Sequence, residues 1–369
     1  MILPFRHVFP SGGFNIVYEL SRRAKNDGQS VQILFIKNMR KVLFNITKDP
    51  ITLLYKREFG IKYILFTYLI NNNSFGPKMI KLVRRFLKIN YDENIENIQT
   101  FYGNSLRKVP KAHNIVATAW ETAFLLQNAK VDSNKYYLIQ NDEDNESFSG
   151  KMSPLVKQTY KFSLKKIVIS DKLERKFAQI GSLRMQIGIN QNIFKLTNPV
   201  NNRRGNRLVV PVRTGEFKGS LLAIALIKEL IKMDVEIHTF GNSRVPVYAK
   251  NLKNHGVIND QQLAAIYNDS DIFVLTSVIE GVPLPPLEAM SCGMAVISTN
   301  NGGINEYIRN GINGIITERN DLESLMQSIK LLLTDYDYRV ALGKESQKVA
   351  GYYSYEKMYE SFKKCLDYK

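Results

Sequence analysis

The sequence predicts an α/β protein with two parallel sheets in tandem, each covered by helices on both faces in a Rossmann-like arrangement. In the second half, short runs of β-branched residues alternate with helical segments, and the first half shows a weaker version of the same alternation. Strand–helix–strand alternation at this pitch is typical of doubly wound parallel sheets. A chain of 369 residues is long enough for two such domains.

We expect five strands in the second half, at residues 208–212, 235–240, 271–276, 294–298 and 314–317. Helical patterns occur between them, at residues 219–233, 260–269, 284–291 and 304–309. In the first half, a glycine turn at Gly12 and Gly13 opens a helix that runs to about residue 26, and strands are expected at 31–36, 115–118 and 136–140.

The polar stretch 198–206 carries the strongest linker signal in the chain. We therefore expect an N-terminal domain over 1–197, a C-terminal domain over 198–350, and a terminal segment over 351–369. The terminal helix, predicted over 354–366, places Tyr355, Met358, Tyr359 and Phe362 on one face. Such an apolar stripe needs a surface to pack on.

The charge is concentrated in the first half of the chain. The formal net charge is +17, and residues 1–190 hold 30 Lys and Arg against 15 Asp and Glu. A basic surface attracts polyanions: nucleic acid, anionic lipid headgroups or phosphorylated substrates. Two cysteines form no disulfide framework, and the opening lacks the apolar run of a signal peptide, so we expect a reducing, cytosolic setting. The longest apolar patch, 63–70, is too short to span a membrane.

Residues 77–89 predict an amphipathic helix with one basic face. Its cations recur at three- and four-residue spacing, and the apolar residues fall on the other side. Such a helix either lies in a membrane interface or is a surface helix whose apolar side joins the core. The basic residues are Lys78, Lys81, Arg84, Arg85 and Lys88.

The densest chemical signal is the segment 280–290, directly after the expected strand 271–276. Ligands of open α/β sheets bind beyond the carboxyl ends of the strands, where a helix N-terminus offers free amides to an anion. Prolines lack an N–H, so the available amides are those of Gly281, Val282, Leu284 and Leu287. Glu280 and Glu288 would repel a phosphate, so we expect them to accept hydrogen bonds from sugar hydroxyls.

Residues 280–293 resemble the signature of retaining glycosyltransferases of family 4, E-G-(F/L)-(G/P)-L-x-x-L-E-A-M-(A/S)-x-G. The resemblance includes 213–219, similar to R-x4-K-G, and residues 298–308 and 310–314, similar to G-G-x-x-E-x-(I/V) and D-G-x-N-G. It implies the GT-B fold, two facing Rossmann-like domains with a C-terminal helix that crosses back to the first. It also implies that the N-terminal domain binds the acceptor and the C-terminal domain binds the donor.

The resemblance assigns roles to individual residues. Arg213 and Lys218 would neutralise the donor diphosphate, and Glu280, the third residue assigned to catalysis, would bind the donor sugar. Fixed cations stabilise a leaving diphosphate as it gains charge. Donor-binding residues implied in all are Gly12, Gly13, Arg213, Lys218, Val257, Glu280, Gly281, Val282, Leu284 and Glu288, with Glu288 on the ribose and Val257 near the base.

Residues 117–123 and 136–143 resemble segments of rhamnosyltransferases in this family, with an extra Asn141 between Gln140 and Asp142. This points to a dTDP-rhamnose or UDP-sugar donor. Glu121, Asp142 and Glu143 are the candidates for positioning the acceptor. His238 reads as a structural residue of a buried strand, whereas His113 precedes a strand edge, from which it could approach the cleft.

The sequence therefore predicts a metal-independent, retaining hexosyltransferase that uses a nucleotide-sugar and no cofactor. The two cysteines and four histidines are scattered, and no nucleic-acid module accompanies the basic charge, so neither a metal site nor nucleic-acid binding is expected. We expect the acceptor to be a polyprenyl-diphosphate-linked glycan of cell-surface polysaccharide synthesis. The enzyme would be cytoplasmic and peripheral at the inner membrane face. The rivals are a sugar-nucleotide 2-epimerase and a partner subunit that has lost donor binding.

Overall fold

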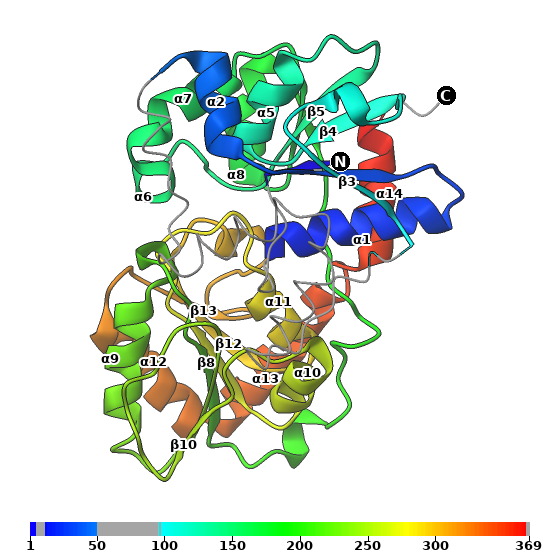
Figure 1. Ribbon diagram of the computed structural model, residues 1–369. Coiled ribbons are helices and arrows are strands. Elements are labelled where there is room, and N and C mark those ends of the chain that lie inside the picture. Colours follow the sequence, from blue (N-terminus) through cyan, green and yellow to red (C-terminus); the bar gives the residue numbers. More distant parts are fainter. Residues whose placement is uncertain (5–11, 50–94, 96, 367–369) are drawn as a thin grey trace. The chain divides into compact units, whose positions relative to one another are not determined.

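The computed structural model describes residues 1–4, 12–49, 95 and 97–366, and its chain divides into two compact units (Figure 1). The first unit comprises Met1–Gln186 together with Met358–Lys369, and the second comprises Ile187–Lys357. The linker predicted over 198–206 belongs to the second unit. The helix predicted over 77–89 and the apolar patch 63–70 lie outside the described residues.

The first unit contains a seven-stranded sheet in the order β3-β2-β1-β4-β5-β6-β7, in which all neighbours pair in parallel. Its strands are β1 (Ile2–Leu3), β2 (Gln32–Ile36), β3 (Gln99–Gly103), β4 (Asn114–Ala117), β5 (Asn134–Ile139), β6 (Lys165–Val168) and β7 (Ser182–Arg184). Its helices are α1 (Gly12–Asn26), α2 (Met39–Thr47), α5 (Trp120–Gln127), α6 (Glu146–Ser149), α7 (Ser153–Thr159), α8 (Asp171–Phe177) and most of α14 (Tyr355–Cys365).

The second unit contains a six-stranded parallel sheet in the order β10-β9-β8-β11-β12-β13. The strands are β8 (Arg207–Pro211), β9 (Glu236–Phe240), β10 (Leu252–Asn254), β11 (Ile272–Leu275), β12 (Ala295–Thr299) and β13 (Ile315–Thr317). The helices are α9 (Ser220–Leu230), α10 (Asp260–Asn268), α11 (Leu284–Ser291), α12 (Leu322–Thr334) and α13 (Tyr336–Ala350). Figure 1 shows α9 and α12 on one face of this sheet and α10, α11 and α13 on the other.

The central strands of the second sheet explain why its pattern was readable from sequence. Every residue of β8, β11 and β12 is buried, because helices cover both faces. Strands buried on both sides read as continuous apolar runs rather than as alternation. The expected strands and helices of this half are found within a few residues, with one exception. The helix predicted over 304–309 is wrong: a single 3₁₀ turn, η7 (Ile304–Glu306), occurs there.

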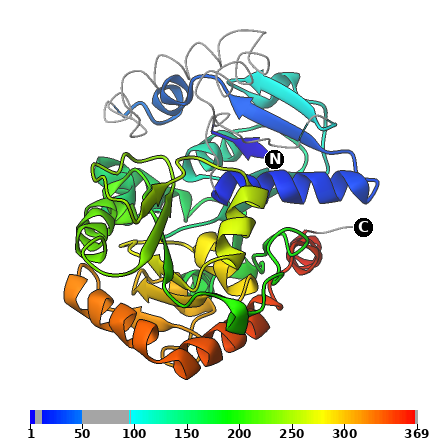
Figure 2. The same ribbon diagram turned by 90° about the horizontal axis from the view of Figure 1, so that it is seen from below.

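The terminal helix α14 packs on the first unit, as its apolar stripe predicted. Met358, Tyr359, Phe362 and Cys365 are buried along one side of the helix. The Tyr359 hydroxyl donates to Asp27 Oδ2 at 3.0 Å, which ties α14 to the end of α1. Figures 1 and 2 both show α14 beside α1. The predicted return of this helix to the N-terminal domain is therefore confirmed.

Candidate functional site

The candidate site of the second unit lies at the carboxyl ends of β8 and β11. Arg213 follows β8, and Lys218 ends the 3₁₀ turn η6 (Glu216–Lys218) that leads into α9. Glu280 lies in the loop between β11 and α11. Because parallel strands end at the same edge of a sheet, these three side chains from separate loops come together.

Gly219 fixes the position of Lys218. Its φ of 65° is left-handed, and a Cβ at this residue would lie 1.8 Å from the carbonyl oxygen of Thr276. Glycine is the residue that tolerates both the positive φ and so close a backbone approach. The loop after β8 therefore packs directly on the end of β11, which brings Lys218 next to Glu280.

A compact network of charged and polar groups joins the two loops. Glu280 Oε1 accepts from Arg213 Nη2 at 2.9 Å and from Ser277 Oγ at 2.9 Å, and Glu280 Oε2 accepts from Lys218 Nζ at 2.7 Å. Arg213 Nη2 also donates to Ser277 Oγ at 2.9 Å. Sequence reasoning missed Ser277; its signal was its place three residues before Glu280, directly after the strand.

The network carries one positive charge in excess. Burial alone would raise the pKa of Glu280, but the charges of Lys218 and Arg213 outweigh it and lower that pKa to about 2. The carboxylate is therefore ionised at neutral pH and balances one of the two cations. The remaining positive charge and the N-terminus of α11 both favour an anion at this edge.

The backbone before α11 supplies unpaired donors. Among the described residues, the amides of Gly281, Val282 and Leu284 have no hydrogen-bond partner, and Pro283 caps the helix without a side-chain bond. The loop is held by its neighbour, because Glu280 N donates to the carbonyl of Asn301 at 3.1 Å. Asn301 was also missed by the sequence analysis. Leu287, by contrast, lies inside α11.

Glu288 lies one turn into α11 and is half-buried. Burial, and then the negative charge of Asp260 at the start of α10, raise the pKa of Glu288 to about 8. The carboxyl group is therefore mostly protonated at pH 7 and can donate as well as accept a hydrogen bond. This suits a partner with hydroxyl groups rather than an anion.

Val257 belongs to a loop anchored at the ends of β9 and β10. Gly241 N donates to the carbonyl of Gly256 at 2.8 Å, and His255 N donates to that of Thr239 at 2.9 Å. His238 is buried in β9, and its Nδ1 lies 3.1 Å from His255 Nε2. His238 thus has the structural surroundings expected of it.

In the first unit, Gly12 and Gly13 open α1 at the carboxyl edge of the sheet. A Cβ at Gly13 would lie 3.2 Å from Gln140 Oε1, so the start of α1 lies against the end of β5. Gln140 Nε2 in turn contacts the carbonyl of Thr118 at 3.4 Å. The sequence-predicted glycine turn and residues of the segments 117–123 and 136–143 therefore meet at one edge.

The three acceptor candidates of the first unit are held by other groups of the fold. Glu143 is buried and accepts from Trp120 N at 3.0 Å and from the Tyr137 hydroxyl at 2.5 Å. Asp142 pairs with Lys172 and Lys176 of α8, at 2.7 and 2.6 Å. Glu121 is 1% exposed. Asp142 and Glu143 thereby anchor the loop after β5, and the assignment of all three carboxylates to the acceptor stays a prediction.

The prediction that His113 could approach the cleft is wrong. His113 precedes β4 at its amino end, and its Nε2 lies 3.3 Å from Asn134 Nδ2 at the start of β5. The two glycines of α1 lie at the opposite, carboxyl edge of the same sheet. A position just before a parallel strand places a side chain at the edge away from the ligand-binding loops.

Two further features of the described residues concern metal ions and membranes. No group of three or more His, Cys, Asp or Glu side chains is arranged to hold a metal ion there. No described helix is both long enough and apolar enough to cross a bilayer.

Residues 244–349, which include Glu280 and Glu288, match the family model described as glycosyl transferases group 1. The second unit carries a glycosyltransferase group 1 domain. The chain is 29% identical over 167 residues to the putative colanic acid biosynthesis glycosyl transferase WcaC of Escherichia coli, covering 41% of each protein.

A second relative is the N,N'-diacetylbacillosaminyl-diphospho-undecaprenol alpha-1,3-N-acetylgalactosaminyltransferase of Campylobacter jejuni. It is 31% identical over 105 residues, 28% of this chain and 28% of that protein. The chain thus spans less than half the length of either relative.

The fold extends beyond the matched domain. The structure of Anabaena HepE in complex with UDP and glucose aligns with 98% of this chain and 98% of its own, with a TM-score of 0.66 at 14% identity. At that identity the likeness concerns the fold. The predicted fold class, two Rossmann-like domains of the GT-B type, is confirmed.

Proposed function

We propose that this protein is a retaining glycosyltransferase that transfers a sugar from a nucleotide-sugar donor to a glycan acceptor. The observation that carries the proposal is the network of Arg213, Lys218 and Glu280 beside the free amides before α11. It combines an excess positive charge for a diphosphate with carboxyl groups for hydroxyls, which is what a sugar nucleotide requires.

In the proposed reaction, Arg213 and Lys218 bind the donor diphosphate and stabilise the charge that it gains as the glycosidic bond breaks. Glu280 orients the donor sugar, and the protonated Glu288 binds the ribose hydroxyls. The departing phosphate oxygen takes the acceptor proton on the same face, so that the anomeric configuration is retained. No metal ion is required, because the two cations and the amides of Gly281, Val282 and Leu284 neutralise the diphosphate.

We further propose that the acceptor is a polyprenyl-diphosphate-linked glycan at the inner membrane face. The named substrate of the Campylobacter jejuni relative and the colanic acid role of the Escherichia coli one support this assignment. The basic first half of the chain supports attraction to an anionic membrane surface. The donor would be dTDP-rhamnose or a UDP-sugar.

Thermal shift against UDP-, dTDP-, GDP- and ADP-sugars tests the donor site. We expect one nucleotide class to stabilise the wild type, Glu288→Ala to lose that response, and Glu345→Ala, an exposed control on α13, to keep it. If no sugar nucleotide shifts the wild type, the proposal fails and the alternative of a partner subunit without donor binding is favoured. Product analysis with donor alone separates a transferase from a 2-epimerase, since an epimerase would need no acceptor.

A further inference from the structure

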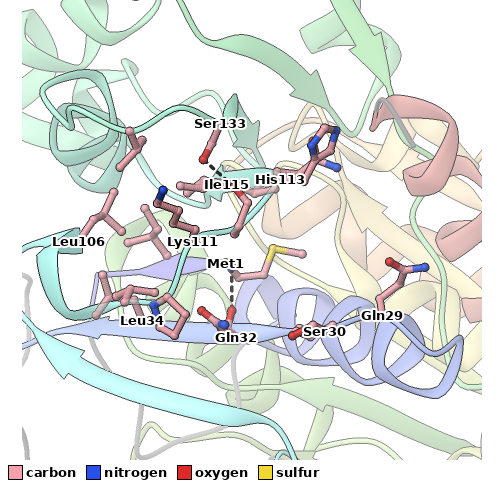
Figure 3. Close-up of a pocket in the computed structure, with 18 of the residues that line it drawn as sticks. Met1, Gln29, Ser30, Gln32, Leu34, Leu106, Lys111, His113, Ile115 and Ser133 are labelled. Carbon is pink, nitrogen blue, oxygen red and sulfur yellow. Dashed lines mark hydrogen bonds between the residues drawn. The ribbon is translucent and has the colours of Figure 1, made fainter. Parts of the chain in front are cut away.

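A pocket of about 730 Å³ opens in the first unit, at the amino ends of β1, β2 and β4. Figure 3 shows Met1 between two walls, with a hydrogen bond from its amino group to the carbonyl of Gln32. Lys111, His113 and Ile115 belong to one wall, and Gln29 and Ser30 belong to the other. The pocket lies at the opposite edge of the sheet from Gly12, Gly13 and Gln140. The proposed transfer reaction does not use it.

The chain connection above this part of the sheet explains the hollow. Parallel strands are usually joined by a crossover of a dozen or more residues that contains a helix. Here the connection from β3 to β4 spans only 104–113, with a single 3₁₀ turn (Leu106–Lys108). That segment lacks the side chains of a long helix, so it borders the pocket without filling it.

The interior of the pocket is apolar in part. Ile2, Leu34 and Val116 are buried side chains of the sheet, and Phe362 of α14 and Leu366, just after that helix, also line the pocket. The described lining residues include no glycine, and Phe362 is the single Phe, Tyr or Trp residue among them. The pocket therefore lacks a glycine-lined phosphate cradle and a stack of aromatic rings for a base, but it can accept an aliphatic chain.

The rim is cationic. Lys111 and Lys130 are exposed lining residues, and neither forms an ion pair with any residue that the structure describes. His113 lies beside them, and Asp132 is the carboxylate among the described lining residues. Lys135, the second residue of β5, and Lys165, the first residue of β6, lie near the same edge. An anionic group at this rim would be attracted without displacing an existing ion pair.

Two polar atoms inside the pocket lack partners. Ser21 Oγ, in a residue that is 0% exposed, and Gln32 Oε1 accept or donate no hydrogen bond among the described residues. A buried polar group without a hydrogen-bond partner lowers the stability of the fold by about 1 to 3 kcal/mol. Gln32 Oε1 needs a donor such as a hydroxyl, and Ser21 Oγ can donate to a carbonyl. Both atoms are buried beneath the pocket surface, so a ligand with a hydroxyl and an ester would satisfy them after a local shift of the lining.

We propose that this pocket binds an anionic, single-chain amphiphile of the lysophosphatidate type. The aliphatic chain occupies the apolar interior, the phosphate meets Lys111 and Lys130 at the rim, and the glycerol hydroxyl and ester meet Gln32 and Ser21. The observed volume is in the range of ordinary small-molecule sites. The ligand could come from solution or from a bilayer, and the chemistry of recognition is the same.

Isothermal titration of the full chain with lysophosphatidate below its micelle concentration tests the proposal. We expect the wild type to bind, and Lys111→Glu/Lys130→Glu to bind at least about tenfold more weakly, a loss of about 1.4 kcal/mol. The matched control, Lys151→Glu/Lys157→Glu, changes the same charge on exposed residues outside the lining and should bind within about twofold of the wild type. Ile115→Trp, which fills the pocket from β4, should abolish binding while retaining the thermal unfolding midpoint within a few degrees.

Two further probes distinguish the sources of the ligand. Inorganic phosphate alone should bind far more weakly than lysophosphatidate, because it lacks the chain. Flotation with phosphatidate vesicles that is lost in Lys111→Glu/Lys130→Glu but kept in the control would identify a membrane lipid as the source. The proposal is overturned if the wild type binds no lysophosphatidate, if both lysine pairs weaken binding equally, or if Ile115→Trp binds like the wild type.

Discussion

Replacing Glu280 by Gln removes one charge from the site of the second unit and keeps the size of the side chain. In the structure, the Glu280 carboxylate accepts from Lys218 Nζ at 2.7 Å and from Arg213 Nη2 and Ser277 Oγ at 2.9 Å each. An amide oxygen can still accept a hydrogen bond. It cannot balance the charge of two neighbouring cations, so the variant isolates the electrostatic part of the network.

The magnitude follows from the pKa. In the fold, the pKa of Glu280 is lowered from 4.5 to about 2, and one pKa unit corresponds to about 1.4 kcal/mol, so the ionised carboxylate contributes about 3 kcal/mol to folding. Solvent only weakly screens the attraction between Glu280 and the two cations, because Glu280 is 8% exposed. A carboxylate with a depressed pKa stabilises the fold fully above its unfolded value, and the contribution is lost as the pH falls from about 4.5 towards 2.

Urea unfolding followed by circular dichroism measures both effects. At pH 7, Glu280→Gln should lower the free energy of unfolding by about 3 kcal/mol, and the difference from wild type should shrink at pH 3. Glu345→Gln removes an exposed partner of Lys348 and should change stability by less than about 1 kcal/mol. If Glu280→Gln matches the wild type at pH 7, or if the difference is the same at pH 3, the electrostatic reasoning is refuted.

Three other substitutions test the surrounding structure by thermal and chemical unfolding. The pKa of Glu288 is raised to about 8, so the wild type should lose stability as the pH rises from 5 to 9. Glu288→Gln has no such carboxyl group and should therefore become more stable relative to wild type over this range. Equal pH profiles of the two proteins would contradict this. Gly219→Ala should lower the free energy of unfolding by more than about 2 kcal/mol. Gly256 has a similar φ of 63°, but nothing lies within 4 Å of an added Cβ, so Gly256→Ala should lower it by about 1 kcal/mol. Similar losses in the two variants would show that the contact with Thr276 is unimportant. Phe362 is 1% exposed, and Phe362→Ala should lower the free energy of unfolding by about 4 kcal/mol. Tyr352 is 65% exposed, and Tyr352→Ala should leave the free energy of unfolding nearly unchanged. A stable Phe362→Ala would contradict the packing of α14 on the first unit.

The strands that stand out most clearly in the sequence are those whose burial is uniform. β11 and β12 are buried at every residue, so their apolar runs stand out from the helices around them. β6 and β7 were missed because they are short and carry charged residues: β6 opens with Lys165 and Lys166, and β7 ends at Arg184. β1 has two residues, too few for any pattern. These strands are defined by their neighbours in the sheet rather than by their own composition.

Some residues of the candidate site could likewise be predicted from the sequence, and others could not. Glu280, Gly281 and Glu288 belong to one continuous segment. The relative positions of such residues can be predicted from the sequence, because they depend on the local backbone alone. The partners of Asp142 are Lys172 and Lys176, which come from α8, about 30 residues further along the chain. Glu143 is likewise held by Trp120 and Tyr137. A loop carboxylate has the same appearance in sequence whether it faces a ligand or an ion pair of the fold, so only the tertiary contacts distinguish the two.

The charge balance of the second unit links its stability to the function proposed for it. Without a ligand, Glu280 is the counterion of both Arg213 and Lys218. A diphosphate at this edge would supply more negative charge than the site needs if both ion pairs persisted, so we expect the two cations to turn to the phosphates and Glu280 to turn to a sugar hydroxyl. Inorganic pyrophosphate should then stabilise Glu280→Gln more than the wild type, because the variant presents both cations uncompensated. Transfer activity should fall in the same variant, because the group that orients the sugar is weakened. Tighter anion binding together with slower transfer would separate the two roles of Glu280, whereas a parallel loss of both would assign it to structure alone.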